Sequence, residues 1–224
     1  MSRWGEDEEV LAVYVDPERR RGEREAAFSE LLARYERRVY AVCYRQLGNH
    51  ADAEDATQDT FVHLARRAHQ FRGDSKLSTF VYRIAVNACR DAQRKQARRP
   101  QTPVADVTQA QTDAGLTPDT AADEVTGRET AMQVQAALDQ LDDLSRTLIV
   151  LCAIEGYSYP EASEILDLPV GTIKSRVFRA RARLADLLVG LDGDADADVA
   201  PLDAPPPLKS VTPPGTPPRG PPVG

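Results

Sequence analysis

The sequence predicts an all-α protein of two small helical domains, and three observations lead to that prediction. Apolar residues recur with helical spacing in two blocks, residues 26–99 and 131–189. No stretch alternates apolar and polar residues with the period of two that marks a half-buried strand, and clusters of β-branched residues are few. The segments outside the two blocks are polar or rich in proline and lack apolar periodicity.

Charge follows the same division of the chain. The 224 residues have a formal net charge of −7, yet residues 26–99 carry +6 and residues 170–189 carry +4. Every other segment is acidic. Most charge runs are simply solvated helix faces. Positive charge confined to two helical segments of an acidic chain, however, points to a polyanionic partner.

Three segments lie outside the helical blocks. Residues 1–25 are a charged extension with a net charge of −3. Residues 100–130 hold three prolines and are predicted to be a flexible acidic linker. Residues 190–224 hold ten prolines and few aliphatic residues, so they cannot bury enough apolar surface to offset the entropy of ordering. We expect this tail to be disordered.

In the first block, residues 26–99, three helices are expected. The apolar stripe of the first helix consists of Phe28, Leu31, Tyr35, Val39 and Val42. Gly48-Asn49 is a break, and the second helix follows with Ala53, Ala56, Thr60, Leu64 and Ala68. The stretch FRGDSKLS, residues 71–78, is the next break, where Ser75 or Ser78 is available as an N-cap. The third helix runs through Leu77, Phe80, Ile84 and Ala88.

The second block, residues 131–189, begins with a helical stripe and then predicts a helix-turn-helix at about 158–179. The stripe consists of Leu138, Leu141, Leu148, Leu151 and Cys152. Ser158 and Glu161 form a capping-box pattern at the start of the next helix, and Pro160 suits its first turn. Asp167-Leu168-Pro169 is the turn, and the second helix opens near Gly171. Its inward stripe is Ile173, Val177, Ala180, Leu184 and Leu187.

That inward stripe leaves polar and basic residues on the outer face of the second helix. They are Thr172, Lys174, Ser175, Arg176 and Arg179. In a helix-turn-helix the N-terminal half of the second helix enters the major groove, where Arg and Lys meet guanine and phosphate. A helical hairpin for protein–protein contact is the alternative, but it does not require a stretch, GTIKSRVFRARARL, without any acid. We therefore predict that these five residues bind DNA.

No catalytic, metal or cofactor site is predicted. Cys43, Cys89 and Cys152 are far apart and flanked by apolar residues, which is typical of buried small hydrophobes rather than of disulfides or a zinc site. HExxH, GxxxxGK and GxSxG patterns are absent from the sequence. No apolar run reaches the ~18 residues of a membrane span, and the acidic N-terminus lacks the order of a signal peptide. We expect a cytoplasmic protein that is not an enzyme.

Three stretches carry a family resemblance. DAEDATQDTFVHLARR and FRGDSKLSTFVYRIAVNACRDAQRKQ resemble conserved region 2 of bacterial RNA polymerase sigma factors of the extracytoplasmic-function (ECF) group. YSYPEASEILDLPVGTIKSRVFRARARL resembles region 4 of that group. The resemblance implies a region 2 domain at 26–99 and a region 4 domain at 131–189. It also implies binding to core RNA polymerase, through the β′ clamp helices and the β flap, and to promoter DNA, and it suggests an anti-sigma factor as a further partner.

The resemblance assigns roles to two groups in the first block. An acidic cluster is implied to dock on the β′ clamp helices, although carboxylates near a helix N-terminus can simply complement its dipole; it consists of Asp52, Glu54, Asp55, Gln58 and Asp59. The third helix and the preceding 71–78 loop are implied to recognise and melt the minus-ten element. Aromatic residues beside basic ones suit single-stranded DNA, and the candidates are Phe80, Tyr82, Asn87, Arg90 and Arg94. For Phe80 alone, the spacing with Ile84 favours a core position instead.

The sequence departs from the family pattern at three positions: Phe80 stands where Trp is common, Ser163 where Ala is usual, and Asp167 where Gly is frequent.

The resemblance implies that the second-block helix-turn-helix recognises the minus-thirty-five element. The competing hypothesis is a helix-turn-helix regulator that acts without polymerase. Residues 52–94 distinguish the two, because a free-standing regulator has no reason to carry them.

Overall fold

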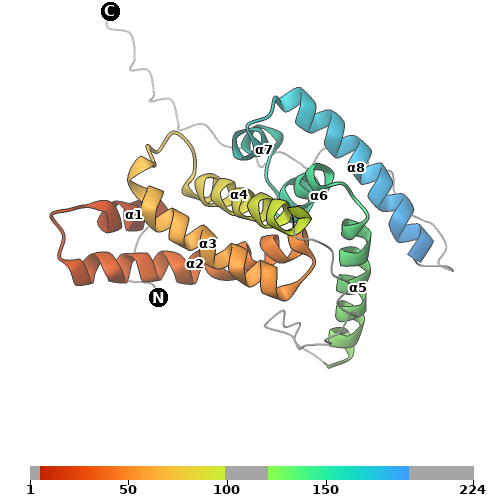
Figure 1. The fold of residues 1–224 in the computed structure, drawn as a ribbon, viewed down its shortest axis with the longest axis horizontal. Coiled ribbons are helices and arrows are strands. Elements are labelled where there is room, and N and C mark those ends of the chain that lie inside the picture. The colour runs from red at the N-terminus through yellow and green to blue at the C-terminus, as the bar shows by residue number, and fades with distance from the viewer. Residues whose placement is uncertain (1–5, 99–120, 192–224) are drawn as a thin grey trace, which may run out of the picture. The chain divides into compact units, whose positions relative to one another are not determined.

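The computed structural model describes residues 6–98 and 121–191, and its side chains are described except at 121–129, 190 and 191. The regular elements of these residues are all helical, which confirms the predicted fold class (Figure 1). The predicted tail from residue 192 onward and the linker residues 99–120 lie outside the described residues.

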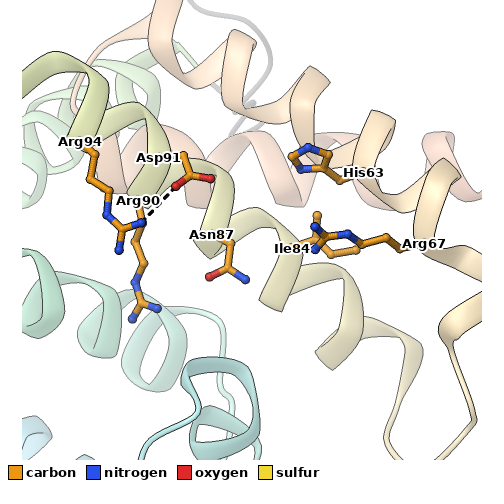
Figure 2. Close-up of a pocket in the computed structure, with 7 residues that line it drawn as sticks. All are labelled: His63, Arg67, Ile84, Asn87, Arg90, Asp91 and Arg94. Carbon is orange, nitrogen blue, oxygen red and sulfur yellow. Dashed lines mark hydrogen bonds and ion pairs between the residues drawn. The ribbon is translucent and has the colours of Figure 1, made fainter. Parts of the chain in front are cut away.

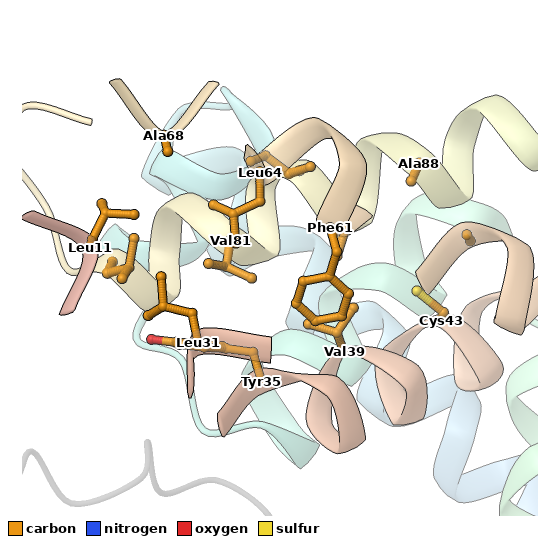
Figure 3. Close-up of a cluster of buried hydrophobic side chains, with 14 of the residues drawn as sticks. Leu11, Leu31, Tyr35, Val39, Cys43, Phe61, Leu64, Ala68, Val81 and Ala88 are labelled. Atoms are coloured by element: carbon orange, nitrogen blue, oxygen red, sulfur yellow. The ribbon is translucent and has the colours of Figure 1, made fainter. Parts of the chain in front are cut away.

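Four α-helices build the first half of the fold: α1 (Asp7–Val15), α2 (Arg21–Leu47), α3 (His50–Arg67) and α4 (Leu77–Arg98), with a 3₁₀ turn, η1 (Ala68–Gln70), after α3. Most of the apolar residues predicted for α2, α3 and α4 meet in one buried cluster (Figure 3), whereas Val42 of α2 belongs to a second one. Leu31 and Val39 of α2, Leu64 of α3 and Val81 of α4 are each fully buried there. The helices are therefore held together by the periodic apolar residues that predicted them.

The break at Gly48-Asn49 has a clear physical cause. Gly48 adopts the left-handed conformation, with φ 73° and ψ 0°, and its N–H bonds to the carbonyl of Tyr44 at 2.8 Å. This conformation ends a helix most readily at glycine. Asn49 then caps α3, because its side-chain oxygen accepts the backbone N–H of Asp52 at 2.8 Å.

Helix α1 is an element that the sequence analysis did not predict within the charged extension of residues 1–25. Its acidic first turn, Asp7 to Glu9, suits a helix N-terminus. Val10 and Leu11 are buried in the same cluster as α2 to α4. Residues 10–15 are all apolar, so they form a continuous run with no helical period, and the pattern alone could not indicate the helix. Helix α2 also begins at Arg21, inside the predicted extension.

The second half of the fold holds α5 (Ala121–Asp139), α6 (Asp143–Ile149), the π-helical η2 (Val150–Ile154), α7 (Tyr159–Leu166) and α8 (Val170–Leu191). Their apolar faces form a second buried cluster that includes Leu138, Leu148, Ile165 and Ile173. Helix α5 starts at Ala121 and so extends into the predicted linker, 100–130. The π-helical turn was not predicted either.

The helix-turn-helix has the predicted start and turn. Ser158 and Glu161 form the capping box: the Ser158 N–H donates to Glu161 Oε2 at 2.9 Å, and the Glu161 N–H donates to Ser158 Oγ at 3.4 Å. Asp167 ends α7 in the left-handed conformation, with φ 55° and ψ 47°. The Ser163 hydroxyl donates to the carbonyl of Leu168 at 2.5 Å and so fixes the turn. Two departures from the family pattern thus lie together here.

Candidate nucleic-acid interface

Helix α4 presents a polar face beside α3. Asn87, Arg90 and Arg94 lie around a cavity of about 300 Å³, together with His63 and Arg67 of α3 (Figure 2). Asp91 is the acidic side chain of this lining and bonds to Arg94 Nη1 at 3.4 Å. Ile84 is the apolar residue of this lining. Guanidinium and amide donors around a small hollow suit phosphate oxygens and base edges.

The two aromatic residues predicted to contact DNA lie elsewhere. Phe80 is half-buried and packs against Phe71, with ring centroids 5.6 Å apart. Tyr82 is fully buried in the second cluster. Its ring packs edge to face with the ring of Tyr157, and the two centroids are 5.1 Å apart. Its hydroxyl donates to Glu155 Oε2 at 3.2 Å. Burial, followed by the charge of Glu155, raises the pKa of Tyr82.

The reason is that α4 has a second apolar stripe. Tyr82 and Val86, four residues apart, pack with Val42 of α2 against the second half of the fold. Polar contacts follow the same boundary: Lys76 Nζ lies 2.8 Å from Glu161 Oε1, and Arg83 Nε donates to the carbonyl of Glu164 at 2.8 Å. The prediction from sequence had placed Tyr82 with the polar, DNA-binding face of the helix and not on a second buried stripe. In this arrangement Tyr82 is not available to a base.

The acidic cluster occupies the outer face of α3. Glu54, Asp55, Gln58 and Asp59 are exposed, whereas Ala53, Ala56 and Thr60 line the buried face. Asp52 differs from the rest because it is half-buried and accepts from Asn49 Nδ2 at 2.8 Å. Within the described part of the chain, Glu54, Asp55 and Asp59 make no salt bridge. Their carboxylates are therefore available to a basic partner.

On α8 the observed burial matches the predicted faces. Ile173, Val177 and Ala180 are buried, whereas the predicted DNA-binding residues Thr172, Lys174, Ser175 and Arg179 are exposed. The helix thus presents hydroxyls and cations along its first turns. This is the composition that base edges and phosphates require in the major groove.

Arg176 is half-buried because it lies over the start of α6. Its Nη1 is 3.3 Å from Asp142 Oδ1. Asp142 also caps α6 by accepting the Ser145 N–H at 3.1 Å. Hydrogen bonding to Ser145, and then the charge of Arg176, lower the pKa of Asp142 against the opposing effect of burial. Arg176, Arg179 and Arg183 line a cavity of about 310 Å³ beside this carboxylate.

Phe178 was not among the site residues predicted from the sequence. Its side chain is 68% exposed on α8, in the middle of the basic stretch. Because the buried stripe runs through Val177, the neighbouring Phe178 had to point outward, and this signal was already present in the sequence. A phenyl ring on a groove-facing helix can contact the methyl group of thymine.

The fold and its charged faces define a helical DNA-binding protein with a helix-turn-helix in its second half. Comparison with known proteins gives a consistent answer. The family model of sigma-70 region 2 matches residues 31–99, and that of sigma-70 region 4 matches residues 131–184. Helix α1 precedes both matched segments.

Relatives and solved structures agree with these matches. The chain is 36% identical over 182 residues to the ECF RNA polymerase sigma factor SigM of Mycobacterium tuberculosis, covering 81% of this chain and 84% of SigM. It is 35% identical over 168 residues to SigW of Bacillus subtilis, covering 70% and 87% of the two chains. The structure of CnrH bound to the cytosolic domain of CnrY has a TM-score of 0.58 at 29% identity, over 84% of this chain and 99% of that one.

A further solved structure is that of the sigma factor RpoE of Bartonella quintana, in complex with the anti-sigma factor NepR. It has a TM-score of 0.57 at 28% identity, over 72% of this chain and 96% of that one. The chain belongs to the ECF family of RNA polymerase sigma factors. It directs promoter recognition by RNA polymerase and is a non-catalytic subunit of that enzyme. The competing hypothesis of a regulator that acts without polymerase is therefore set aside.

Three further observations concern the described residues. Among residues 6–98 and 121–191, no three His, Cys, Asp or Glu side chains are grouped as metal ligands would be. In the same ranges, no helix is long and apolar enough to cross a membrane. Cys43, Cys89 and Cys152 are free cysteines, and their burial agrees with the role of small buried hydrophobes predicted for them.

Proposed function

We propose that three surfaces of this sigma factor each bind a different partner or promoter element. The exposed carboxylates of α3 dock on the β′ clamp helices of core polymerase. The polar face of α4, with the 71–76 segment, recognises and melts the minus-ten element. The outer face of α8 reads the minus-thirty-five element. The observation that carries the proposal is the separation of charge, with acidic residues exposed on α3 and basic ones on α4 and α8.

Helix α8 supports its assignment through the arrangement of its side chains. Lys174, Ser175 and Arg179 are exposed on one helix, and Arg176 is oriented by Asp142 at 3.3 Å. A guanidinium held in one orientation can form the paired hydrogen bonds to guanine that discriminate between bases. The exposed ring of Phe178 adds an apolar contact on the same helix.

On α4, the proposal assigns minus-ten recognition first to Asn87, Arg90 and Arg94. Phe80, which lies half-exposed near the start of the helix, is the aromatic residue available for stacking. A contact between Tyr82 and a base requires that the second half of the fold leave α4. Binding to polymerase, which must present two promoter elements to two separate surfaces, is the step at which we expect this to occur.

Other partners follow from the family and from its neighbours. We propose that the region 4 domain, 131–189, contacts the β flap and that the protein works in the cytoplasm, where core polymerase lies. The solved RpoE neighbour is bound to an anti-sigma factor. This supports an anti-sigma factor as a partner of the present chain, on helices that also serve polymerase or DNA.

The experiment that tests the proposal is transcription in vitro with purified core polymerase and a library of promoters randomised in both elements. The wild-type protein should select a preferred sequence in each element. Asn87→Ala and Arg90→Ala should impair strand opening, measured by permanganate reactivity of thymines, while binding to the upstream element persists. Unchanged strand opening in both variants would contradict the role of α4.

A further inference from the structure

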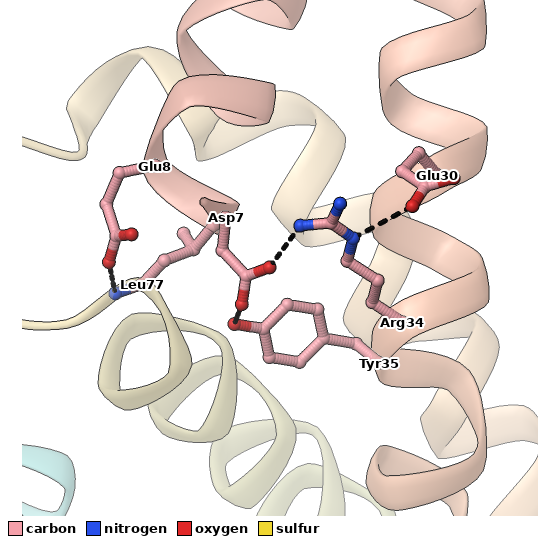
Figure 4. A network of polar contacts seen from close by, with 6 residues as sticks. All are labelled: Asp7, Glu8, Glu30, Arg34, Tyr35 and Leu77. Atoms are coloured by element: carbon pink, nitrogen blue, oxygen red, sulfur yellow. Dashed lines mark hydrogen bonds and ion pairs between the residues drawn. The ribbon is translucent and has the colours of Figure 1, made fainter. Parts of the chain in front are cut away.

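Helix α1 lies before the segment that matches region 2, residues 31–99, yet two of its carboxylates reach into that segment. Asp7 accepts from Arg34 Nη1 at 2.7 Å and from the Tyr35 hydroxyl at 2.5 Å. Glu8 Oε1 accepts the backbone N–H of Leu77 at 3.0 Å (Figure 4). Since Leu77 is the first residue of α4, α1 connects α2 to the start of the helix that is proposed to read the minus-ten element.

Helix α1 is a firm support for this contact. Val10 and Leu11 are buried against α2 to α4. The Tyr14 hydroxyl donates to the carbonyl of Ala65 at 3.3 Å, and Arg24 Nε donates to the carbonyl of Tyr14 at 2.8 Å. Asp7 adds a bond to a tyrosine, Tyr35, whose exposure is only 3%. Helix α1 is thus held at both of its ends, through Asp7 and Tyr14, and this fixes the backbone that carries Glu8.

The bond from Leu77 to Glu8 has a defined effect on α4. The first N–H groups of a helix have no partner within the helix. A carboxylate that accepts one of them stabilises the first turn and complements the positive end of the helix dipole. Neither Ser75 nor Ser78 accepts the Leu77 N–H; the acceptor comes from a residue 69 positions earlier. The largely exposed segment 72–76 therefore ends at a residue that is bonded to α1.

We propose that Glu8 is a positioning residue for minus-ten recognition. By holding the first turn of α4, Glu8 fixes the end of the 71–76 segment. The segment then samples fewer conformations before DNA binds to it. A surface ordered before binding discriminates better, because less binding energy is lost in ordering it. This inference rests on the proposed function, in which α4 and this segment contact the minus-ten element.

The test compares three variants of the full chain, each assembled with core polymerase. Glu8→Ala removes the acceptor, and Glu8→Gln keeps a neutral oxygen acceptor at the same distance. Glu9→Ala is the matched control, because the Glu9 side chain is exposed on the same turn and makes no hydrogen bond or ion pair within the described residues. Two promoter libraries serve as probes: one is randomised only in the minus-ten element, the other only in the minus-thirty-five element.

Loss of a capping acceptor should reduce the preference for the selected minus-ten bases about fivefold in Glu8→Ala. The minus-thirty-five preference should not change, Glu8→Gln should recover part of the loss, and Glu9→Ala should behave as wild type. Hydrogen exchange at the Leu77 amide, measured on the free proteins, should accelerate by a similar factor in Glu8→Ala. A purely structural defect would instead weaken both preferences together.

Two results would overturn the inference. One is an unchanged minus-ten preference in Glu8→Ala despite faster exchange at Leu77. The other is an equal loss of preference in both elements. Failure of the proposed function gives a different result, because the wild-type protein would then select no minus-ten sequence at all. If Glu8→Ala lowers helicity, the comparison of Glu8→Gln with Glu9→Ala decides the question through the same two libraries.

Discussion

Among the described residues, Asp167 is the one non-glycine residue with a positive φ, which is 55°. A left-handed conformation is disfavoured for residues with a Cβ, and Asp tolerates it better than Ala does. Asp167→Ala should therefore lower the free energy of unfolding by about 1 kcal/mol. Asp167→Gly should stay within about 0.5 kcal/mol of wild type, because the strain it relieves is offset by the greater freedom of the unfolded chain. Urea denaturation checks both values, and equal destabilisation by both changes would contradict the argument.

Arg176 is the residue with the clearest expected role in base recognition. Arg176→Ala should weaken binding of the upstream element by about 1–3 kcal/mol and relax the base preference at one position. Lys174→Ala is the matched control: it removes one exposed cation from the same helix and should weaken all sequences about equally. Fluorescence anisotropy with selected and scrambled duplexes measures both effects. A loss that is equal on both duplexes for Arg176→Ala would assign it to phosphate contact instead.

The same region shows why single positions are hard to assign from sequence. The spacing of Ile173, Val177 and Ala180 correctly predicted which face of α8 is buried. The ion pair between Arg176 and Asp142 was not predictable, because it joins residues 34 positions apart. The burial of Tyr82 and Val86 in the second cluster was not predictable from the sequence either. One helix can carry two apolar stripes, and only the packing of α4 on both halves of the fold distinguishes them.

Helix α3 is the element whose outer face is predicted to bind polymerase. Reversing Asp55 and Asp59 to Lys should weaken the association with core polymerase and leave helicity unchanged, because both side chains are exposed and oppositely charged surfaces steer and orient such encounters. The matched control reverses Glu9 and Glu36, two exposed acids on other helices. Co-purification of stoichiometric core polymerase with the Asp55/Asp59 variant would contradict the docking role.

The start of α7 is the element in which a charge pair and a helix cap share one carboxylate. Burial alone would raise the pKa of Glu161, but hydrogen bonds from Lys76 and Ser158 outweigh it and lower that pKa. A carboxyl group with a depressed pKa contributes stability above its ordinary value of 4.5 and loses it as the pH falls through the folded value. Lys76→Ala should therefore raise the pKa of Glu161.

Carboxyl carbon shifts in an NMR titration measure this change. The difference in free energy of unfolding between wild type and Lys76→Ala should also shrink as the pH falls below 4.5 and Glu161 becomes protonated. Lys174→Ala again serves as a control, since Lys174 forms no hydrogen bond or ion pair with either member of this pair in the described residues. A Glu161 pKa that is the same in Lys76→Ala and wild type would show that the pair forms only transiently.

At the scale of the whole molecule, Glu155 joins the two halves of the fold. Its side chain is only 10% exposed and lies 3.5 Å from Arg45 Nη1, 4.0 Å from Arg38 Nε and 3.2 Å from the Tyr82 hydroxyl. The three partners come from α2 and α4, whereas Glu155 follows η2. Without this carboxylate, the buried Tyr82 hydroxyl loses its hydrogen-bond acceptor. Glu155→Ala should therefore weaken the contact between the halves by about 1–3 kcal/mol.

Energy transfer between fluorophores on Val62→Cys and Val189→Cys, two exposed positions on α3 and α8, reports this change. The three native thiols are buried and should label slowly. Glu164→Ala is the matched control, because Glu164 contacts Arg83 through its backbone carbonyl and its side chain is exposed. Glu155→Ala should lower transfer efficiency, and acrylamide should quench Tyr82 more strongly. Unchanged transfer would mean that the apolar contacts of Val42, Tyr82 and Val86 and the remaining polar contacts hold the halves together without Glu155.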